Sequence, residues 1–174
     1  MKSLCFSVLC MLMVSCGVVN VNYDYDKETD FSSYTTYSYF GDMETGLSDF
    51  DERRLMNAME ITLKSKGLLF SEEPDLLINV QSLVSKGQVN NSVGVGVGGG
   101  SSIGGGVSVG IPIGRPNVSR TITIDLVDAK KDVLIWQAVS ESPFKESDTP
   151  IVKEQKMQEV IAKIFTKYPP KQRK

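Results

Sequence analysis

The chain has 174 residues, with 19 Lys and Arg against 21 Asp and Glu, a formal net charge of −2 and no histidine. Without histidine, the chain has no Ser-His-Asp or Cys-His catalytic set and no metal site with imidazole ligands. The nearly balanced charge argues against nucleic-acid binding, because that function needs a basic face to neutralise phosphates. A chain of this length suits one domain with a single core.

The N-terminal segment has the features of a secretory signal peptide. Lys2 precedes an apolar run over residues 4–14, which is too short to be a transmembrane helix. All three cysteines, Cys5, Cys10 and Cys16, lie in this segment. Residues 13–16 resemble a bacterial lipobox, so we expect residues 1–15 to be removed and Cys16 to be the lipid attachment site. The alternative is an ordinary signal peptide that contains a cysteine.

The expected anchor predicts where the protein resides. One acyl chain binds a membrane only marginally, whereas two or more, palmitate among them, hold a protein there stably. Gly17 follows the cysteine where retention in the inner membrane usually calls for Asp. We therefore expect a protein of the bacterial cell envelope that is lipid-anchored to the outer membrane. Its orientation, facing the periplasm or the cell surface, stays open.

The mature chain alternates between strand and helix patterns. Residues 19–25, 34–40, 75–84, 119–127 and 133–140 are predicted strands, because they alternate apolar with polar residues or are rich in β-branched and aromatic ones. Ser48 and Gly67 bound one predicted helix as N-cap and C-cap. Pro150 opens a second helix, which ends at Tyr168 before two prolines. The predicted inward-facing residues are Leu55, Met56, Met59, Thr62, Leu63, Leu76, Ile78, Val80, Ile122, Ile124, Leu126, Val152, Val160, Ile161, Ile164 and Phe165.

Glycine is concentrated in one segment: eleven of the fifteen glycines fall in residues 87–114. Valine and isoleucine alternate with small residues over residues 93–97 and again over 107–113, which predicts a Gly-rich β-hairpin over residues 86–115. Glycine permits close backbone approach, so this hairpin is a candidate for pairing with another sheet edge. The alternative is a loose surface hairpin with no partner.

The order of these elements predicts an α+β fold over residues 16–174. We expect a mostly antiparallel sheet with two helices packed on one face, plus the Gly-rich hairpin. A doubly wound parallel fold is disfavoured because only one βαβ crossover can be built.

Three groups of residues are candidates for a metal, cofactor or ligand site. Asp24, Asp26, Glu28 and Asp30 could bind Ca²⁺, but they lack the Gly and distal Glu of an EF-hand loop, so a solvated turn is preferred. The glycines do not complete a phosphate-binding motif, because Ser101 stands where the third Gly is needed. Trp136 with Tyr34, Tyr37 and Tyr39 could line a groove, but a lone Trp in a strand is usually core. We therefore expect no cofactor and no metal.

Several ordered stretches resemble a known family. They are residues 23–26, 29–32, 34–37, 66–67, 74–77, 121–129 with Trp136, and 167–170. Together they resemble the family catalogued as domain of unknown function 4136, which is common among bacterial envelope lipoproteins. The resemblance implies an α+β domain on a lipid tether, with no established activity.

The leading hypothesis is a lipid-anchored, non-enzymatic module that binds or assembles with an envelope protein partner. The first alternative is a hydrolase that uses carboxylates such as Asp24, Asp125 and Asp128, because two carboxylates alone can perform acid-base catalysis. The second alternative is a structural protein that self-associates through exposed strand edges.

Overall fold

The computed structural model describes residues 18–87, 92–94, 110–112 and 118–171. The predicted signal peptide and Cys16 lie outside these residues. The elements follow in the order β1 (Asn20–Tyr25), η1 (Phe31–Ser33), β2 (Thr36–Tyr39), α2 (Asp49–Ser65), β3 (Leu69–Phe70), β4 (Leu76–Lys86), β5 (Ser92–Gly94), β6 (Gly110–Pro112), β7 (Val118–Asp128), β8 (Val133–Pro143), α3 (Pro150–Ile164) and η2 (Phe165–Lys167).

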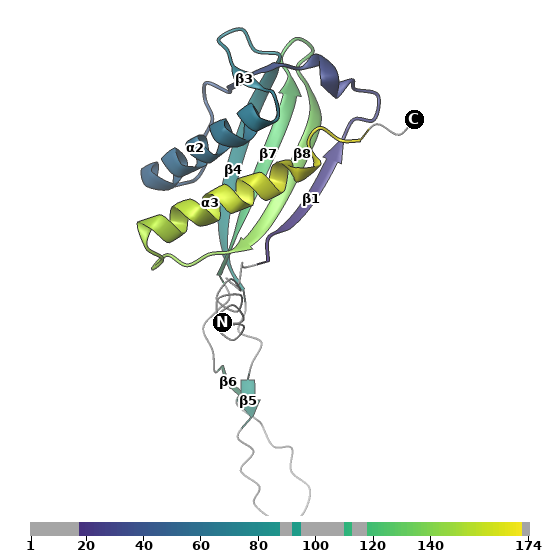
Figure 1. Cartoon of the computed structure of the whole chain (residues 1–174). Helices are drawn as coiled ribbons and strands as arrows, with labels where there is room; N and C mark the ends of the chain where they lie inside the picture. The colour runs from purple at the N-terminus through teal and green to yellow at the C-terminus, as the bar shows by residue number, and fades with distance from the viewer. Residues whose placement is uncertain (1–17, 88–91, 95–109, 113–117, 172–174) are drawn as a thin grey trace, which may run out of the picture.

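The main sheet has six strands in the order β1-β8-β7-β4-β2-β3. Both helices lie on one of its faces (Figure 1), so the predicted α+β class is confirmed. The prediction of a mostly antiparallel sheet is wrong, because the sheet is mixed: β1, β8, β7 and β4 pair antiparallel, whereas β2 pairs parallel with both β4 and β3. The reason is the α2 crossover, which returns the chain to the same end of the sheet before β4 begins.

Local sequence explains where the two helices begin and end. The Ser48 hydroxyl accepts a hydrogen bond from the Asp51 N–H, and Gly67 ends α2 with a φ of +84°. In α3, the Thr149 hydroxyl accepts from the Val152 N–H, and Pro150 occupies the first turn. Ser48 is thus the N-cap that the sequence predicted, whereas the C-cap of α2 is Lys66 and the predicted Gly67 follows it.

The core lies between the sheet and the two helices. Leu76, Ile78 and Val80 of β4 are fully buried, as predicted. Trp136 stacks on Phe165 with ring centroids 5.4 Å apart, and Tyr168 meets both rings edge-on. Trp136 is therefore a core residue, as predicted. Trp136 stands opposite Leu126 at an inward position of the regular alternation, and the irregularity in the β7–β8 pairing at Leu126/Val127 lets its neighbour Ile135 be buried as well.

Only part of the predicted Gly-rich hairpin falls in described residues. β5 and β6 pair antiparallel, with Ser92 opposite Pro112 and Gly94 opposite Gly110. Residues 88–91, 95–109 and 113–117 lie outside the described residues. The hairpin as a whole stays a prediction.

Candidate interaction surface

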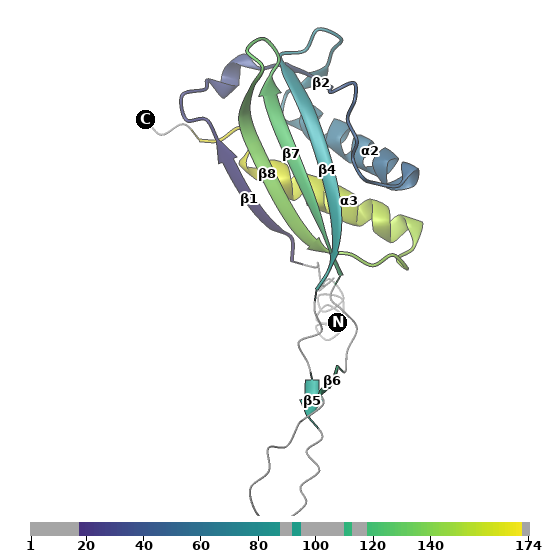
Figure 2. The same cartoon turned by 180° about the vertical axis from the view of Figure 1, so that it is seen from behind.

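The face of the sheet opposite the helices carries no second layer among the described residues (Figure 2). Cross-strand pairing places the alternate side chains of β1, β8, β7 and β4 on this face in rows. We call it the open face and define it by Asn22, Asp24, Asn79, Gln81, Thr123, Asp125, Gln137 and Val139. All eight residues are exposed or half-buried.

One row of the open face is a hydrogen-bonded ladder of polar side chains. Asp24, Gln137, Asp125 and Asn79 stand opposite one another on four successive strands. The Gln137 amide donates to Asp125 Oδ1 at 2.7 Å, and the Asn79 amide donates to Asp125 Oδ2 at 3.3 Å. Asp125 therefore serves as an acceptor that links three strands and fixes the orientation of two amides.

The adjacent row is polar and less constrained. Asn22, Val139, Thr123 and Gln81 follow one another across the same four strands. Asn22 and Gln81 are exposed. The open face thus presents amide and hydroxyl groups that can donate and accept hydrogen bonds with a partner.

A depression of about 500 Å³ lies at one side of the open face. One wall is the loop after β2, with Phe40 and Met43, and the other includes Asn79 and Asp125 of the sheet. This mixture of apolar and polar lining groups is typical of binding surfaces. The depression is therefore the part of the open face best shaped to receive a protruding group.

The strand β1 leaves one edge of the sheet unpaired among the described residues. It pairs only with β8, and Tyr23 on it is 40% exposed. An exposed edge of this kind is a template for strand pairing with another chain. On the other side of the sheet, β2 pairs with β4 only at Leu76–Ile78, and the loop after β2 covers a later part of β4: the Ser82 N–H donates to the Thr45 carbonyl at 2.7 Å.

The acidic residues after β1 act as turn caps. Asp26 accepts from the Glu28 N–H and the Thr29 hydroxyl, and Asp30 accepts from the Ser32 N–H and hydroxyl. These hydrogen bonds hold the pKa of both carboxyls below the ordinary value. No group of three or more His, Cys, Asp or Glu side chains in the described part of the chain is arranged to hold a metal ion.

The three carboxylates considered for a hydrolase do not converge. Asp125 is on the open face, whereas Asp128 stands opposite Leu76 on the helix side of the sheet and is 5% exposed. Burial alone would raise the pKa of Asp128, but hydrogen bonds from the Tyr34 hydroxyl and the N–H groups of Lys131 and Lys130 lower it to about 2. Asp24 is separated from Asp125 by the strand β8. Asp128 is a structural residue at the β7–β8 turn.

The tyrosines considered as groove residues are also structural. Tyr37 is 3% exposed and meets Tyr39 and Phe70 edge-on. Tyr34 donates to Asp128 at 2.8 Å. The sequence did not single out Asn79, Gln81 and Gln137 as candidate binding residues. Their only distinguishing feature in the sequence is that they occupy polar positions of predicted strands.

The sequence of the domain matches one family model over most of its length. The family described as "Domain of unknown function (DUF4136)" matches residues 21–170. The chain belongs to this family. No curated protein matches the chain, and no helix in the described ranges is long and apolar enough to cross a membrane.

Solved structures share the fold of this DUF4136 domain. A crystal structure of a PDZ domain protein from Parabacteroides distasonis aligns with a TM-score of 0.56 at 14% identity, over 98% of this chain and 41% of that one. The chain thus spans less than half the length of that protein. The PelC dodecamer from Paraburkholderia phytofirmans aligns with a TM-score of 0.50 at 9% identity, over 85% of this chain and 96% of that one. At these identities the likeness concerns the fold alone.

Proposed function

We propose that this protein is a lipid-anchored module of the bacterial cell envelope that docks another envelope protein on its open face. The observation that carries the docking role is the open face itself, where a four-strand ladder of polar side chains lies beside a depression of about 500 Å³. The lipobox resemblance at residues 13–16 supports the anchor at Cys16, and Gly17 in place of Asp after the cysteine supports a location at the outer membrane. No nucleic acid and no cofactor enter the proposal.

The anchor is tested by comparing the natural chain with Cys16→Ser. We expect the natural chain to carry acyl groups on an N-terminal Cys16 by mass spectrometry and to remain with membranes at high salt. The Cys16→Ser chain should lack these groups and leave the membrane fraction. An unmodified Cys16 in the natural chain would overturn the anchor.

The docking role is tested by placing bulky charge on the open face. Gln81→Arg with Thr123→Arg should abolish co-purification of the partner captured from crosslinked envelopes, because two bulky guanidinium groups would replace small hydrogen-bonding side chains and change the charge of the surface. The matched control is Glu60→Arg on the exposed side of α2, which should leave capture unchanged. Equal capture by both variants would contradict the proposal.

A second candidate function is self-association, and two observations favour it. β1 offers an unpaired edge among the described strands, and PelC, which shares the fold, forms a dodecamer. Under this alternative the mass of the detergent-solubilised protein rises with concentration. The Asp26 N–H donates to the Ile135 carbonyl of the neighbouring strand, so by alternation the Tyr23 N–H points away from β8, toward the free edge. Tyr23→Pro should abolish the rise, because proline cannot donate a backbone hydrogen bond. The hydrolase alternative has no such support, because Asp125 and Asp128 lie on opposite faces.

A further inference from the structure

One end of the domain combines the chain's exit toward Cys16 with exposed apolar and basic side chains. Asn20, Glu141, Thr121 and Leu83 stand opposite one another in one row across β1, β8, β7 and β4. This row marks the end of the sheet at which β1 begins. We call it the tether end.

The tether end cannot lie far from an anchored Cys16. Four residue steps separate Cys16 from Asn20, and an extended chain spans at most about 3.6 Å per residue, or about 14 Å in all. By contrast β4 has eleven residues, which makes the sheet about 36 Å long. If Cys16 is lipidated as proposed above, the tether end is therefore the end held next to the bilayer.

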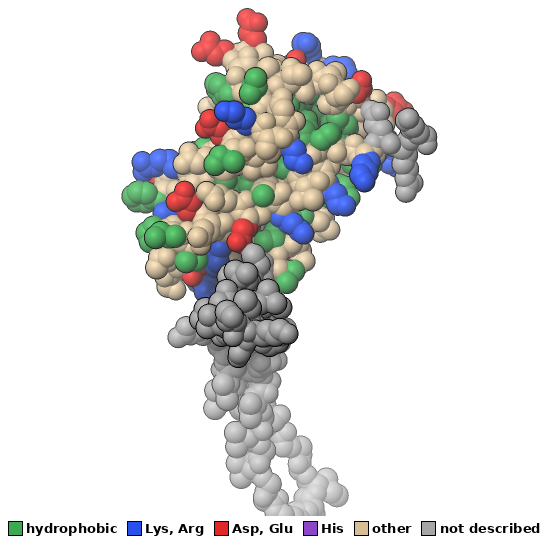
Figure 3. Space-filling view, in the orientation of Figure 1, with side chains coloured by type: hydrophobic (Ala, Val, Ile, Leu, Met, Phe, Trp, Pro, Cys, Tyr) green, Lys and Arg blue, Asp and Glu red, His purple; other side chains and the backbone are tan. Residues whose placement is uncertain are grey.

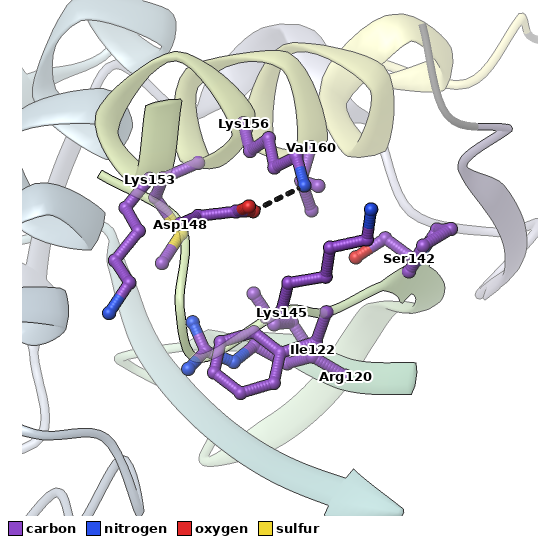
Figure 4. Close-up of a pocket in the computed structure, with 11 residues that line it drawn as sticks. Arg120, Ile122, Ser142, Lys145, Asp148, Lys153, Lys156 and Val160 are labelled. Atoms are coloured by element: carbon purple, nitrogen blue, oxygen red, sulfur yellow. Dashed lines mark hydrogen bonds and ion pairs between the residues drawn. The ribbon is translucent and has the colours of Figure 1, made fainter. Parts of the chain in front are cut away.

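A small basic cavity of about 40 Å³ opens at the tether end between α3 and the sheet (Figure 4). Its four cationic lining residues are Arg120, Lys145, Lys153 and Lys156, against a single acid, Asp148. Arg120 is engaged by Asp51 at 2.8 Å, and Lys156 is engaged by Asp148 at 2.6 Å. Lys145 and Lys153 have no ion pair with another described residue, so their ammonium groups are the charges that remain for a ligand.

Exposed apolar side chains also lie at the tether end, outside the lining of this cavity. Ile151, in the first turn of α3, is 70% exposed, and Phe50, next to Asp51 in the first turn of α2, is 68% exposed. Arg53 lies over the Phe50 ring at 5.0 Å from its centroid. Leu83 in the row defined above is 69% exposed. Figure 3 shows hydrophobic side chains gathered at this end of the two helices, with basic ones among them.

We propose that the tether end is a membrane-docking face for the bilayer that carries the anchor. Lys145 and Lys153 would contact the phosphates of anionic phospholipids, and Phe50 and Ile151 would enter the interfacial layer. Large apolar side chains next to lysine and arginine are the combination that binds such surfaces, with each cation near an anionic surface adding to the attraction. Glu146 and Glu154 neighbour the two lysines in sequence but do not line the cavity.

The inference rests on the proposed anchor, and the experiment separates the two. After removal of residues 1–15 and lipidation of Cys16, the mature chain has no free thiol, so Ile151→Cys introduces a single labelling site. The acylated protein, labelled with a fluorophore at this site, is reconstituted into phosphatidylethanolamine and phosphatidylglycerol vesicles that contain a lipid-borne quencher. The matched control is Phe70→Cys on β3, which is 62% exposed and lies outside the tether end.

We expect the label at position 151 to be quenched several-fold more than the label at position 70. Lys145→Glu with Lys153→Glu should reduce the quenching at position 151 to the control level, while unchanged Trp136 emission shows that the variant is folded. Equal quenching at the two positions in an acylated protein, or quenching unaffected by the charge reversal, would overturn the docking face alone. A natural chain without acylation by mass spectrometry would overturn both the anchor and this inference.

Discussion

The guanidinium of Arg120 on β7 donates to the carboxylate of Asp51 in the first turn of α2 at 2.8 Å. Arg54 donates to the other oxygen of the same carboxylate at 2.8 Å, and the Phe144 ring lies under Arg120 with its centroid 3.9 Å away. Burial alone would raise the pKa of Asp51, but the two arginines hold it below the ordinary value. This partly buried cluster joins the first turn of α2 to the sheet at the tether end.

Removing one partner of this cluster should be costly. Asp51→Asn leaves Arg120, whose side chain is 12% exposed, without this counter-charge. Breaking a fully buried pair typically costs about 3–5 kcal/mol in the free energy of unfolding, so we expect about 2–3 kcal/mol for this half-buried pair. Urea denaturation followed by Trp136 fluorescence measures the loss. Glu60→Gln, an exposed change on the same helix, is the control and should stay within about 0.5 kcal/mol. Equal effects of the two variants would mean that Asp51 does not join α2 to the sheet.

The pair of Asp128 and Tyr34 predicts a dependence of stability on pH. The pKa of Asp128 is lowered to about 2, so its stabilising contribution is complete above the ordinary pKa of 3.8 and is lost as the pH falls toward 2. Burial and the Asp128 carboxylate raise the pKa of Tyr34 to about 12, so its contribution is lost as the pH rises from 10 toward 12.

Tyr34→Phe tests this pair directly. The variant removes the hydroxyl donor while it keeps the ring, so we expect it to lose about 1.5–3 kcal/mol at neutral pH, as for a hydrogen bond to a charged group. It should also flatten the loss of stability between pH 4 and pH 2. Denaturation curves at each pH provide the measurement, and an unchanged acid slope would contradict the assigned role of the hydroxyl.

Gly46 should not tolerate a side chain. It has a φ of +68°, and a Cβ there would lie 2.7 Å from the backbone oxygen of Ser82. Gly46→Ala should therefore lower the free energy of unfolding by about 1–3 kcal/mol. Gly41→Ala is the matched control, because a Cβ at Gly41 meets nothing within 4 Å. If both variants were equally stable, the loop after β2 would not be held against β4 as described.

The aromatic stack should account for a large part of the core stability. Phe165→Ala removes the ring stacked on Trp136 and leaves a cavity beneath α3, which typically costs about 3–5 kcal/mol. Thermal unfolding by circular dichroism measures this loss. Trp136 is the only tryptophan, so a shift of its emission to longer wavelength reports the new access of water. An unshifted emission maximum in the folded variant would contradict the stacking.

The elements of the fold could be predicted wherever the hydrophobic period was regular. The alternation in β4 and β7 predicted both strands and their inward-facing residues. Ser48 and Gly67 marked the two ends of α2, and Pro150 marked the start of α3. β3 was missed because Leu69 and Phe70 form only two residues of strand, and both are exposed. A segment that short carries no period.

The pairing of strands and the candidate surface depended on tertiary structure. The parallel pairing of β2 with β4 is set by the direction in which α2 returns the chain, and no local residue encodes that choice. Asn79, Gln81 and Gln137 each occupy an ordinary polar position in a strand. Only the register across three strands brings Asn79 and Gln137 to the same carboxylate of Asp125.

The most direct test of the docking role is site-specific photocrosslinking in intact cells. A photoreactive amino acid is placed at Gln81 or Asn22 on the open face, and at Ile61, which is 63% exposed on α2, as the control. We expect one discrete crosslinked protein, the same from both open-face positions and absent from position 61. Crosslinks from position 61 with none from the open face would contradict the docking role.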